Sequence, residues 1–166
     1  MNMVFEPVTF WSDNEEKKKI SFVLPPRQRA MFSVLKQLRE KSGTANVLAP
    51  YTPTPDAIVS AALEFAGVGE GDVVYDVGCG DARLLTAAIE RGAVKAVGWD
   101  IDTKAIEDAQ ERIDGLKLGD RVSVSCEDVF TAPIDWAAAS VIVLYLSVQG
   151  NLRLRPILLG MEEARA

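Results

Sequence analysis

The stretch VVYDVGCGDARLL, residues 73–85, contains the residue types and spacings that most clearly indicate chemistry. An apolar run leads to Asp76, Gly78 and Gly80 follow, and an amphipathic pattern begins directly afterwards. A strand, a glycine turn and a helix in this order direct backbone N–H groups at a ligand. The P-loop pattern is excluded because no Lys-Ser or Lys-Thr pair follows. The dinucleotide pattern GxGxxG is excluded because Arg83 occupies its third glycine position.

Two further acidic residues follow the next apolar stretches. Asp100 comes 22 residues after Gly78, at the place where an acid binds ribose hydroxyls in nucleoside-binding α/β folds. Asp128 follows the third stretch, where its carboxylate can accept a hydrogen bond from an exocyclic amine. Asp76 would repel a pyrophosphate but attract a cation. A ligand with a ribose, an adenine amine and a positive charge but no phosphate is S-adenosylmethionine, and these residues predict it as the cofactor.

A regular alternation of strands and helices is predicted to position these acids. The predicted strands are 73–77, 94–99, 121–126 and 140–146. The predicted helices are 26–41, a segment from Pro55 to Gly67 with Thr54 as its cap, 82–91, and one that Asp102 caps. Strands separated by helices pair in parallel, so we expect an α/β fold with a doubly wound parallel sheet. The most apolar strands, 73–77 and 140–146, are expected at its centre.

Composition favours one domain, preceded by an N-terminal extension. We expect residues 1–45 to form the extension and residues 46–166 the cofactor-binding domain. The domain carries 10 Lys and Arg against 19 Asp and Glu, an acidic balance that disfavours nucleic acid and attracts cations. Histidine is absent, and Cys79 and Cys126 fit neither a disulfide framework nor a zinc site, so no metal is expected. No signal peptide or membrane span is recognisable, which favours the cytoplasm.

The segments VVYDVGCGDARLL, VGWDID and CEDVF, in this order and spacing, resemble the cofactor motifs of class I S-adenosylmethionine-dependent methyltransferases, which have a Rossmann-like sheet. The longer stretch PYTPTPDAIVSAALEFAGVGEGDVVYDVGCGDARLL is similar to the small protein-lysine N-methyltransferases of the ATP synthase c-subunit and adenine nucleotide translocase type. LYL at 144–146 resembles a later strand of the same proteins. Ala82 departs from the pattern, because a third glycine is usual there.

The resemblance implies a set of site residues, each of which also has a purely structural explanation. The implied cofactor-binding residues are Tyr51, Thr54, Asp76, Gly78, Gly80, Asp81, Asp100, Ile101, Asp128 and Val129. Tyr51 and Tyr145 are the implied catalytic residues, lining a pocket for a lysine amine. Thr54 could instead only cap a helix, Asp128 could be a turn residue, and Tyr145 could be a core aromatic. The resemblance also leaves a mitochondrial location open, although the membrane anchor of those proteins is not recognisable here.

The same resemblance predicts a shortened fold. In those proteins a fifth strand and a hairpin follow the helix that NLRLRPILLGMEEARA, 151–166, would form. The resemblance therefore implies a sheet truncated after its fourth strand and that helix. The apolar strand 140–146 would then lie at or near a sheet edge, where a partner or a second copy could bind. The predicted activity is in-line methylation of protein lysine by proximity. The alternatives are an RNA or small-molecule methyltransferase, or a truncated cofactor- or partner-binding protein with little activity.

Overall fold

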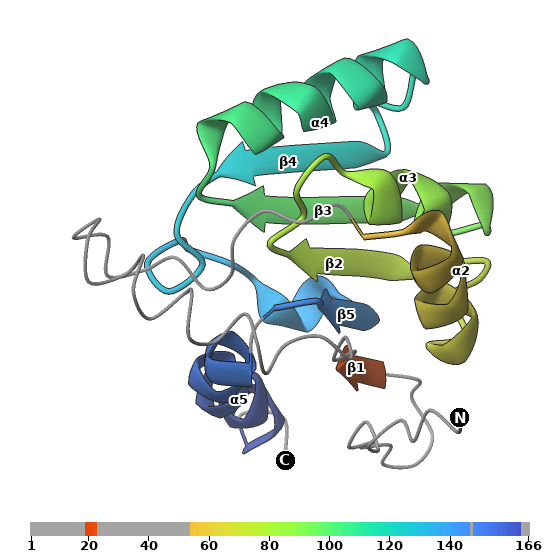
Figure 1. The fold of residues 1–166 in the computed structure, drawn as a ribbon. Helices are drawn as coiled ribbons and strands as arrows, with labels where there is room; N and C mark the ends of the chain where they lie inside the picture. Colours follow the sequence, from red (N-terminus) through yellow and green to blue (C-terminus); the bar gives the residue numbers. More distant parts are fainter. Residues whose placement is uncertain (1–18, 23–53, 147, 164–166) are drawn as a thin grey trace, which may run out of the picture.

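The described residues form a five-stranded parallel sheet with helices on both faces. The computed structural model describes residues 19–22, 54–146 and 148–163. The strands are β1 (Lys19–Phe22), β2 (Val73–Val77), β3 (Lys95–Asp100), β4 (Val122–Cys126) and β5 (Val141–Leu144). Their order across the sheet is β1-β5-β2-β3-β4, and every neighbouring pair is parallel. The arrowheads of β2, β3 and β4 therefore reach the same edge of the sheet (Figure 1).

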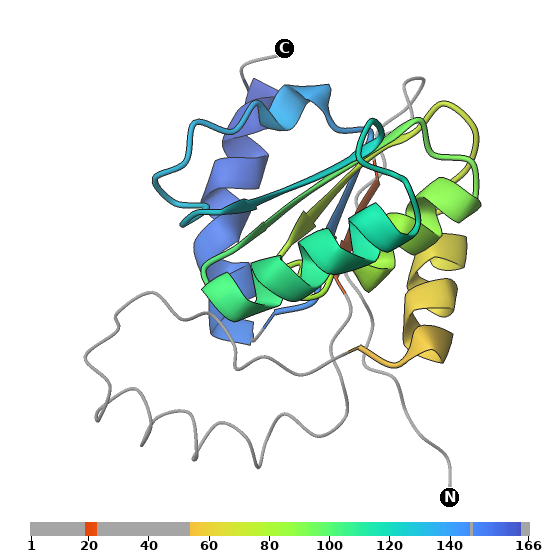
Figure 2. The ribbon, with the colours of Figure 1, turned by 90° about the horizontal axis from the view of Figure 1, so that it is seen from above.

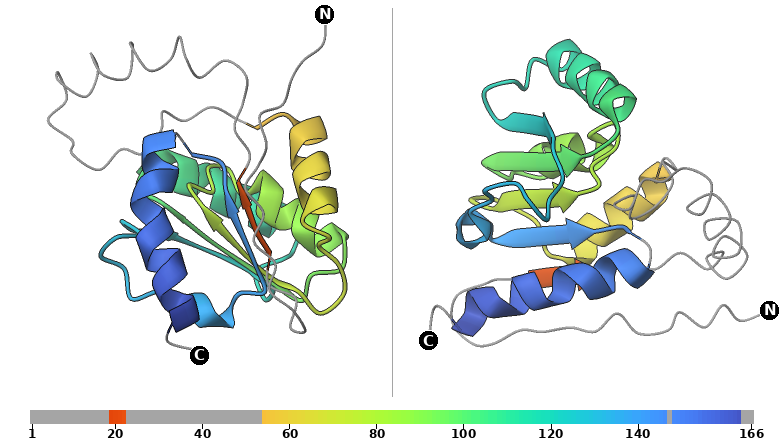
Figure 3. Two further views of the ribbon diagram at one scale, coloured as in Figure 1. Left: turned by 90° about the horizontal axis from the view of Figure 1, so that it is seen from below. Right: turned by 90° about the vertical axis from the view of Figure 1, so that its left-hand side faces the viewer.

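Within the described ranges, three α-helices cover one face of the sheet and one α-helix covers the other. Helices α2 (Asp56–Phe65), α3 (Arg83–Glu90) and α4 (Thr103–Gly115) lie together on the first face (Figure 2). Helix α5 (Val148–Glu163) and the short 3-10 helix η1 (Trp136–Ala138) lie on the second face (Figure 3). The fold is thus the doubly wound α/β sheet that the alternating pattern predicted. No helix in the described ranges is both long enough and apolar enough to cross a membrane.

Alternation along the central strand β2 divides the core into two layers. Val74 points into the layer shared with α2, α3 and α4, whereas Tyr75 and Val77 point into the layer shared with α5. The full burial of β5 and the near-full burial of β2 confirm that these two strands are central. Because Asp76 lies on the same side of β2 as Val74, its carboxyl group enters the layer that the three helices cover.

An aromatic cluster fills the second face next to α5. The rings of Tyr75 and Trp99 meet edge to face, with centroids 4.9 Å apart, and Trp136 lies 6.0 Å from Trp99. Trp99 and Trp136 therefore pack in or beside the core, as expected of most tryptophans. The connection between β4 and β5 contains only η1 as a regular element, so these large side chains supply much of the apolar cover there.

The predicted elements agree with the structure apart from small shifts at their ends. Residues 73–77 form a strand as predicted, and Asp102 caps α4 by accepting from the N–H groups of Lys104 and Ala105. The prediction that Thr54 caps α2 is wrong, because Pro55 occupies the N-cap and no side chain caps that helix. The predicted helix 26–41 lies outside the described residues.

On the side of β5 opposite to β2 lies a strand that was not predicted from the sequence. No strand was predicted within the N-terminal extension, yet β1 pairs with β5 from Lys19 opposite Val141 to Phe22 opposite Leu144. Strand β5 is therefore second from the edge and paired on both sides. The surface that was expected to recruit a partner is covered over its whole length by a strand of the same chain.

We predict that Gly98→Ala destabilises the protein by about 1–3 kcal/mol, the usual cost of overpacking a core. A Cβ atom at Gly98 would lie 2.6 Å from Cβ of Cys79 and 2.7 Å from Cδ1 of Leu85. Gly119→Ala is the matched control, since nothing lies within 4 Å of a Cβ atom there. Urea denaturation measures both free energies of unfolding, and equal values for the two variants would contradict the prediction.

Candidate functional site

Three acidic residues lie at the carboxyl ends of three adjacent strands. Asp76 is the penultimate residue of β2, Asp100 is the last residue of β3, and Asp128 follows the end of β4 by two residues. Because the strands are parallel and neighbouring, the three acids stand in a row along one edge of the sheet. The crevice outside the carboxyl ends of parallel strands is where open α/β sheets bind their ligands.

The glycine turn between β2 and α3 lies directly against β3. The N–H groups of Gly78 and Cys79 both donate to the carbonyl oxygen of Trp99, at 2.8 and 3.1 Å. Gly78 has a φ angle of +77°, and a Cβ atom there would lie 2.7 Å from Cδ2 of Leu146. A side chain at this position would therefore be both strained and obstructed, which explains the glycine.

Ala82 takes a backbone conformation that favours glycine. It is the N-cap of α3, is completely buried, and has a φ angle of +60°. A left-handed conformation costs a residue with a Cβ atom roughly 1–2 kcal/mol. The backbone at position 82 thus has a conformation that glycine would adopt without strain, although an alanine stands there.

Asp100 fastens the turn to the end of β3. Its Oδ2 accepts from the N–H of Gly80 at 3.0 Å, and its Oδ1 accepts from the N–H of Asp102 at 3.0 Å. Since each carboxylate oxygen has two lone pairs, both remain able to accept a further hydrogen bond from a ribose hydroxyl. Asp102 separately caps α4 as predicted, whereas ribose binding by Asp100 stays a prediction.

Asp76 is a buried carboxyl group close to other acids. Only 3% of the residue is exposed, and no hydrogen bond from a donor in the described residues reaches its side chain. Burial, and then the charges of Asp100 and Asp81, raise its pKa to about 7. A positively charged ligand group at this position would stabilise the ionised form, because it supplies the missing opposite charge.

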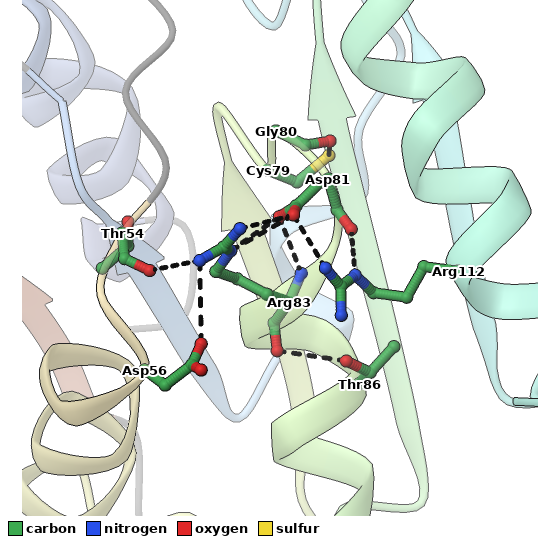
Figure 4. Close-up of polar contacts among 8 residues, drawn as sticks. All are labelled: Thr54, Asp56, Cys79, Gly80, Asp81, Arg83, Thr86 and Arg112. Carbon is green, nitrogen blue, oxygen red and sulfur yellow. Dashed lines mark hydrogen bonds and ion pairs between the residues drawn. The ribbon is translucent and has the colours of Figure 1, made fainter.

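Asp81 is held between two arginines (Figure 4). Its carboxylate accepts from Nε and NH2 of Arg83 at 2.9 and 2.7 Å, and from NH2 of Arg112 at 2.8 Å. Burial alone would raise the pKa of Asp81, but the hydrogen bonds from Arg83 and Arg112 outweigh it and lower the pKa to about 2. The side chain thus binds within the protein, so its expected contact with the cofactor stays a prediction that this geometry does not support.

The two arginines were not recognised as site residues from the sequence. In the sequence, Arg83 served only to exclude the dinucleotide pattern. Arg112 is 31 residues from Asp81 in the sequence and lies on helix α4. The one sequence pattern that could have indicated this ion pair is the position of Arg83, two residues after Asp81 in the predicted turn.

The end of β4 forms a compact turn around Asp128. Its Oδ1 accepts from the N–H of Phe130 at 3.0 Å, and its backbone oxygen accepts from the N–H groups of Thr131 and Ala132. This is the turn role that was considered as its alternative, and contact of Asp128 with an adenine stays a prediction. Ile101 is 42% exposed after β3, whereas Val129 is buried.

The predicted catalytic tyrosines are only partly placed by the structure. Tyr145 is half-buried and follows β5 directly, at the same edge of the sheet as the acids. Burial raises the pKa of Tyr145, so its hydroxyl stays protonated at neutral pH. Tyr51 lies outside the described residues. The backbone oxygen of Thr54 accepts from NH1 of Arg83 at 2.8 Å, which brings the start of α2 to the glycine turn.

The arrangement fits the donor set that S-adenosylmethionine requires. Asp76 is a buried carboxyl group without a described hydrogen-bond donor and can face the amino-acid end of the cofactor. Asp100 has accepting capacity left for a ribose, and Ile101 exposes an apolar surface beside it. A pyrophosphate at the glycine turn would lie near the buried carboxyl group of Asp76, which favours a ligand without phosphate at that position.

Comparison with known proteins gives a consistent family. Residues 76–165, more than half of the chain, match the model of the ANTKMT methyltransferase domain. A protein-lysine N-methyltransferase of Saccharolobus islandicus (strain REY15A) is 37% identical over 108 residues, which cover 64% of this chain and 66% of that protein. A ribosomal protein L11 methyltransferase of Enterobacter sp. (strain 638) is 40% identical over 55 residues, or 33% of this chain and 19% of that protein. The chain therefore matches less than two thirds of the length of these curated relatives.

Solved structures agree with the fold. An RNA methyltransferase from Salinibacter ruber, in complex with S-adenosyl-L-homocysteine, is 37% identical with a TM-score of 0.60, covering 64% of this chain and 69% of that chain. The C-terminal domain of precorrin-6Y C5,15-methyltransferase from Rhodobacter capsulatus has a TM-score of 0.56 at 18% identity, covering 66% of this chain and 60% of that chain. The second likeness concerns the fold alone.

We predict that Asp76 makes the stability of the ligand-free protein depend on pH. The pKa of Asp76 is about 7 in the folded protein against an ordinary value of 3.8, so its contribution to the free energy of unfolding is complete below pH 4 and is lost as the pH rises to 7. Relative to Asp76→Asn, the wild type should lose up to about 1.4 kcal/mol per pH unit in this window. Urea denaturation of both proteins at pH 4, 5, 6, 7 and 8 measures the difference. A difference that stays constant with pH would refute the assignment.

Proposed function

The chain belongs to the ANTKMT methyltransferase domain family, and on this premise we propose that it transfers a methyl group from S-adenosylmethionine to the side-chain amine of a lysine in a protein. The observation that carries the proposal is the row of Asp76, Asp100 and Asp128 beside a glycine turn at one edge of a parallel sheet. The family has the class I fold, and S-adenosylmethionine is its cofactor.

The preference for lysine has two supports. The Saccharolobus relative is a protein-lysine N-methyltransferase, and residues 46–166 carry an excess of acidic side chains that attracts a cationic substrate. RNA is the second candidate substrate, because the Salinibacter protein of equal identity is an RNA methyltransferase. The same acidic excess opposes it, since a phosphate backbone would be repelled.

The proposed reaction forms a bond between the lysine nitrogen and the methyl carbon while the bond from that carbon to sulfur breaks. S-Adenosylmethionine supplies a methyl group on a positively charged sulfur, which leaves as a neutral thioether. Asp76 binds the amino group of the cofactor and Asp100 binds its ribose hydroxyls, while Asp128 accepts from the adenine amine. The lysine must first lose a proton to water, which partial desolvation near Tyr145 favours. Proximity and orientation then provide the rate enhancement.

Methyl transfer can be tested with cofactor carrying a radiolabelled methyl group. We expect label in a lysine-rich protein extract but not in RNA or in small amines. Asp100→Asn should remove at least about nine tenths of the transfer, because an amide cannot accept from both Gly80 and Asp102 and a lost charged hydrogen bond weakens binding by tenfold or more. Asp120→Asn, on an exposed loop before β4, is the control. Label in RNA alone would establish the second candidate instead.

A binding measurement separates cofactor recognition from catalysis. S-Adenosylhomocysteine at about 100 times its Kd should add roughly 2.7 kcal/mol to the free energy of unfolding and raise the Tm, whereas NAD should do neither. A shift without any methyl transfer would favour a cofactor-binding protein with little activity. No shift would refute the assigned site itself.

We predict that Tyr145→Phe lowers methyl transfer by about tenfold or more, the scale of one lost transition-state hydrogen bond. Its protonated hydroxyl can accept a hydrogen bond from the lysine amine and align the nitrogen, and phenylalanine cannot. The affinity for S-adenosylhomocysteine, measured by calorimetry, should stay unchanged because the side chain serves the acceptor. Full transfer by the variant would show that Tyr145 is only a core aromatic.

A further inference from the structure

Arg83 joins the glycine turn to the start of α2. It is the first residue of α3, and its guanidinium group makes contacts in two directions (Figure 4). Nε and NH2 donate to the carboxylate of Asp81 in the turn. NH1 donates to the backbone oxygen of Thr54 at 2.8 Å and lies 3.6 Å from Oδ1 of Asp56. One planar side chain thus holds two segments that are almost thirty residues apart in sequence.

The contacts that Arg83 makes with the turn and with the start of α2 differ in strength. The Arg83 and Asp81 side chains are only 24% and 12% exposed, so their charged hydrogen bonds are shielded from competing water. The contact with Asp56 is weak, since that side chain is 94% exposed and the atoms are 3.6 Å apart. The short bond to the Thr54 carbonyl is therefore the main link to α2. A backbone carbonyl is always present, whatever side chain stands at position 54.

Arg112 provides an internal comparison. Its NH2 donates to the same carboxylate of Asp81 at 2.8 Å, and its Nε donates to the Asp81 backbone oxygen at 2.9 Å. It extends from α4 and contacts the turn from the other side, so its described bonds do not include α2. The two arginines share the carboxylate of Asp81, but only Arg83 continues to Thr54.

We propose that Arg83 is a positioning residue that transmits occupation of the cofactor turn to the first turn of α2. The proposal rests on the proposed function, because the cofactor is what occupies the turn. A ligand that binds against Gly78 and Gly80 restricts the turn and with it the carboxylate of Asp81. The guanidinium held by that carboxylate then keeps its bond to Thr54, and the start of α2 becomes more ordered.

Two amides in the first turn of α2 allow the proposed effect of Arg83 on that helix to be measured away from Asp76 and Asp100. The N–H groups of Ile58 and Val59 both donate to the backbone oxygen of Pro55, at 2.8 and 3.1 Å. These bonds open when the start of the helix frays, and hydrogen exchange of the two amides measures that opening. Pro55 directly follows Thr54, so loss of the Arg83 bond acts on the residue next to the reporters.

Amide hydrogen exchange of Ile58 and Val59 by NMR, with and without S-adenosylhomocysteine, tests the proposal in the wild type, Arg83→Gln and Arg112→Gln. Both variants remove a cation from Asp81 and should weaken ligand affinity similarly. In the ligand-free state, Arg83→Gln should speed exchange of the two amides by about tenfold, the effect of losing one charged hydrogen bond, and Arg112→Gln should not. Saturating ligand should slow the exchange in the wild type and in Arg112→Gln but not in Arg83→Gln.

Arg83→Lys adds a second discriminating variant. The ammonium group of lysine has its donors on a single nitrogen, so it cannot reach Asp81 and Thr54 together as the planar guanidinium does. We therefore expect Arg83→Lys to behave like Arg83→Gln. Equal exchange at Ile58 and Val59 in the Arg83→Gln and Arg112→Gln proteins, with and without ligand, would overturn the proposal. If the wild type fails to bind S-adenosylhomocysteine, the proposed function is wrong. The ligand-free comparison then still decides whether Arg83 orders the start of α2.

Discussion

The contact between the glycine turn and strand β3 is the constraint on which the carboxyl edge of the sheet depends. Gly98 lacks a side chain, so Cys79 and Leu85 pack directly against β3. This close approach lets the backbone of the turn donate to Trp99 and lets Asp100 accept from Gly80. A larger residue at position 98 would push the turn away and separate all of these partners together. The positions of the glycine turn and of Asp100 are thus a consequence of the close packing of Cys79 and Leu85 against Gly98.

Three carboxyl groups within this edge present an electrostatic problem that the chain solves in three ways. Asp81 is neutralised by two arginines, and its pKa falls to about 2. Asp100 is solvated by two backbone N–H groups of the turn and of the next loop. Asp76 has neither and retains a proton more readily, with a pKa of about 7. Among these three acids, Asp76 is the one without internal compensation, and it is the one for which we propose contact with the positively charged amino group of the cofactor.

The sequence indicated those parts of the fold that local patterns determine. The strand at 73–77, the cap at Asp102 and the row of acids could be predicted, because periodicity and parallel pairing place strand ends at a common edge. The Asp81–Arg112 pair could not be, since it joins residues on separate elements and has no local pattern. The strand β1 was missed for the same reason, as KISF is short and is stabilised only by a partner far along the chain. The prediction for Thr54 failed although its local pattern was favourable. Threonine is a good capping residue, but the N-cap of α2 is Pro55, one position later.

The pairing of β1 with β5 has a consequence for the order of folding. Lys19 lies opposite Val141, so the first strand of the described residues depends on the last of them. Closing a loop of that length costs more entropy than any other pairing in the sheet, and such long-range contacts form late. During synthesis β1 leaves the ribosome before the other described strands, but it must wait for β5, which emerges after them. The strand that covers the free side of β5 is therefore expected to be the last to join the sheet.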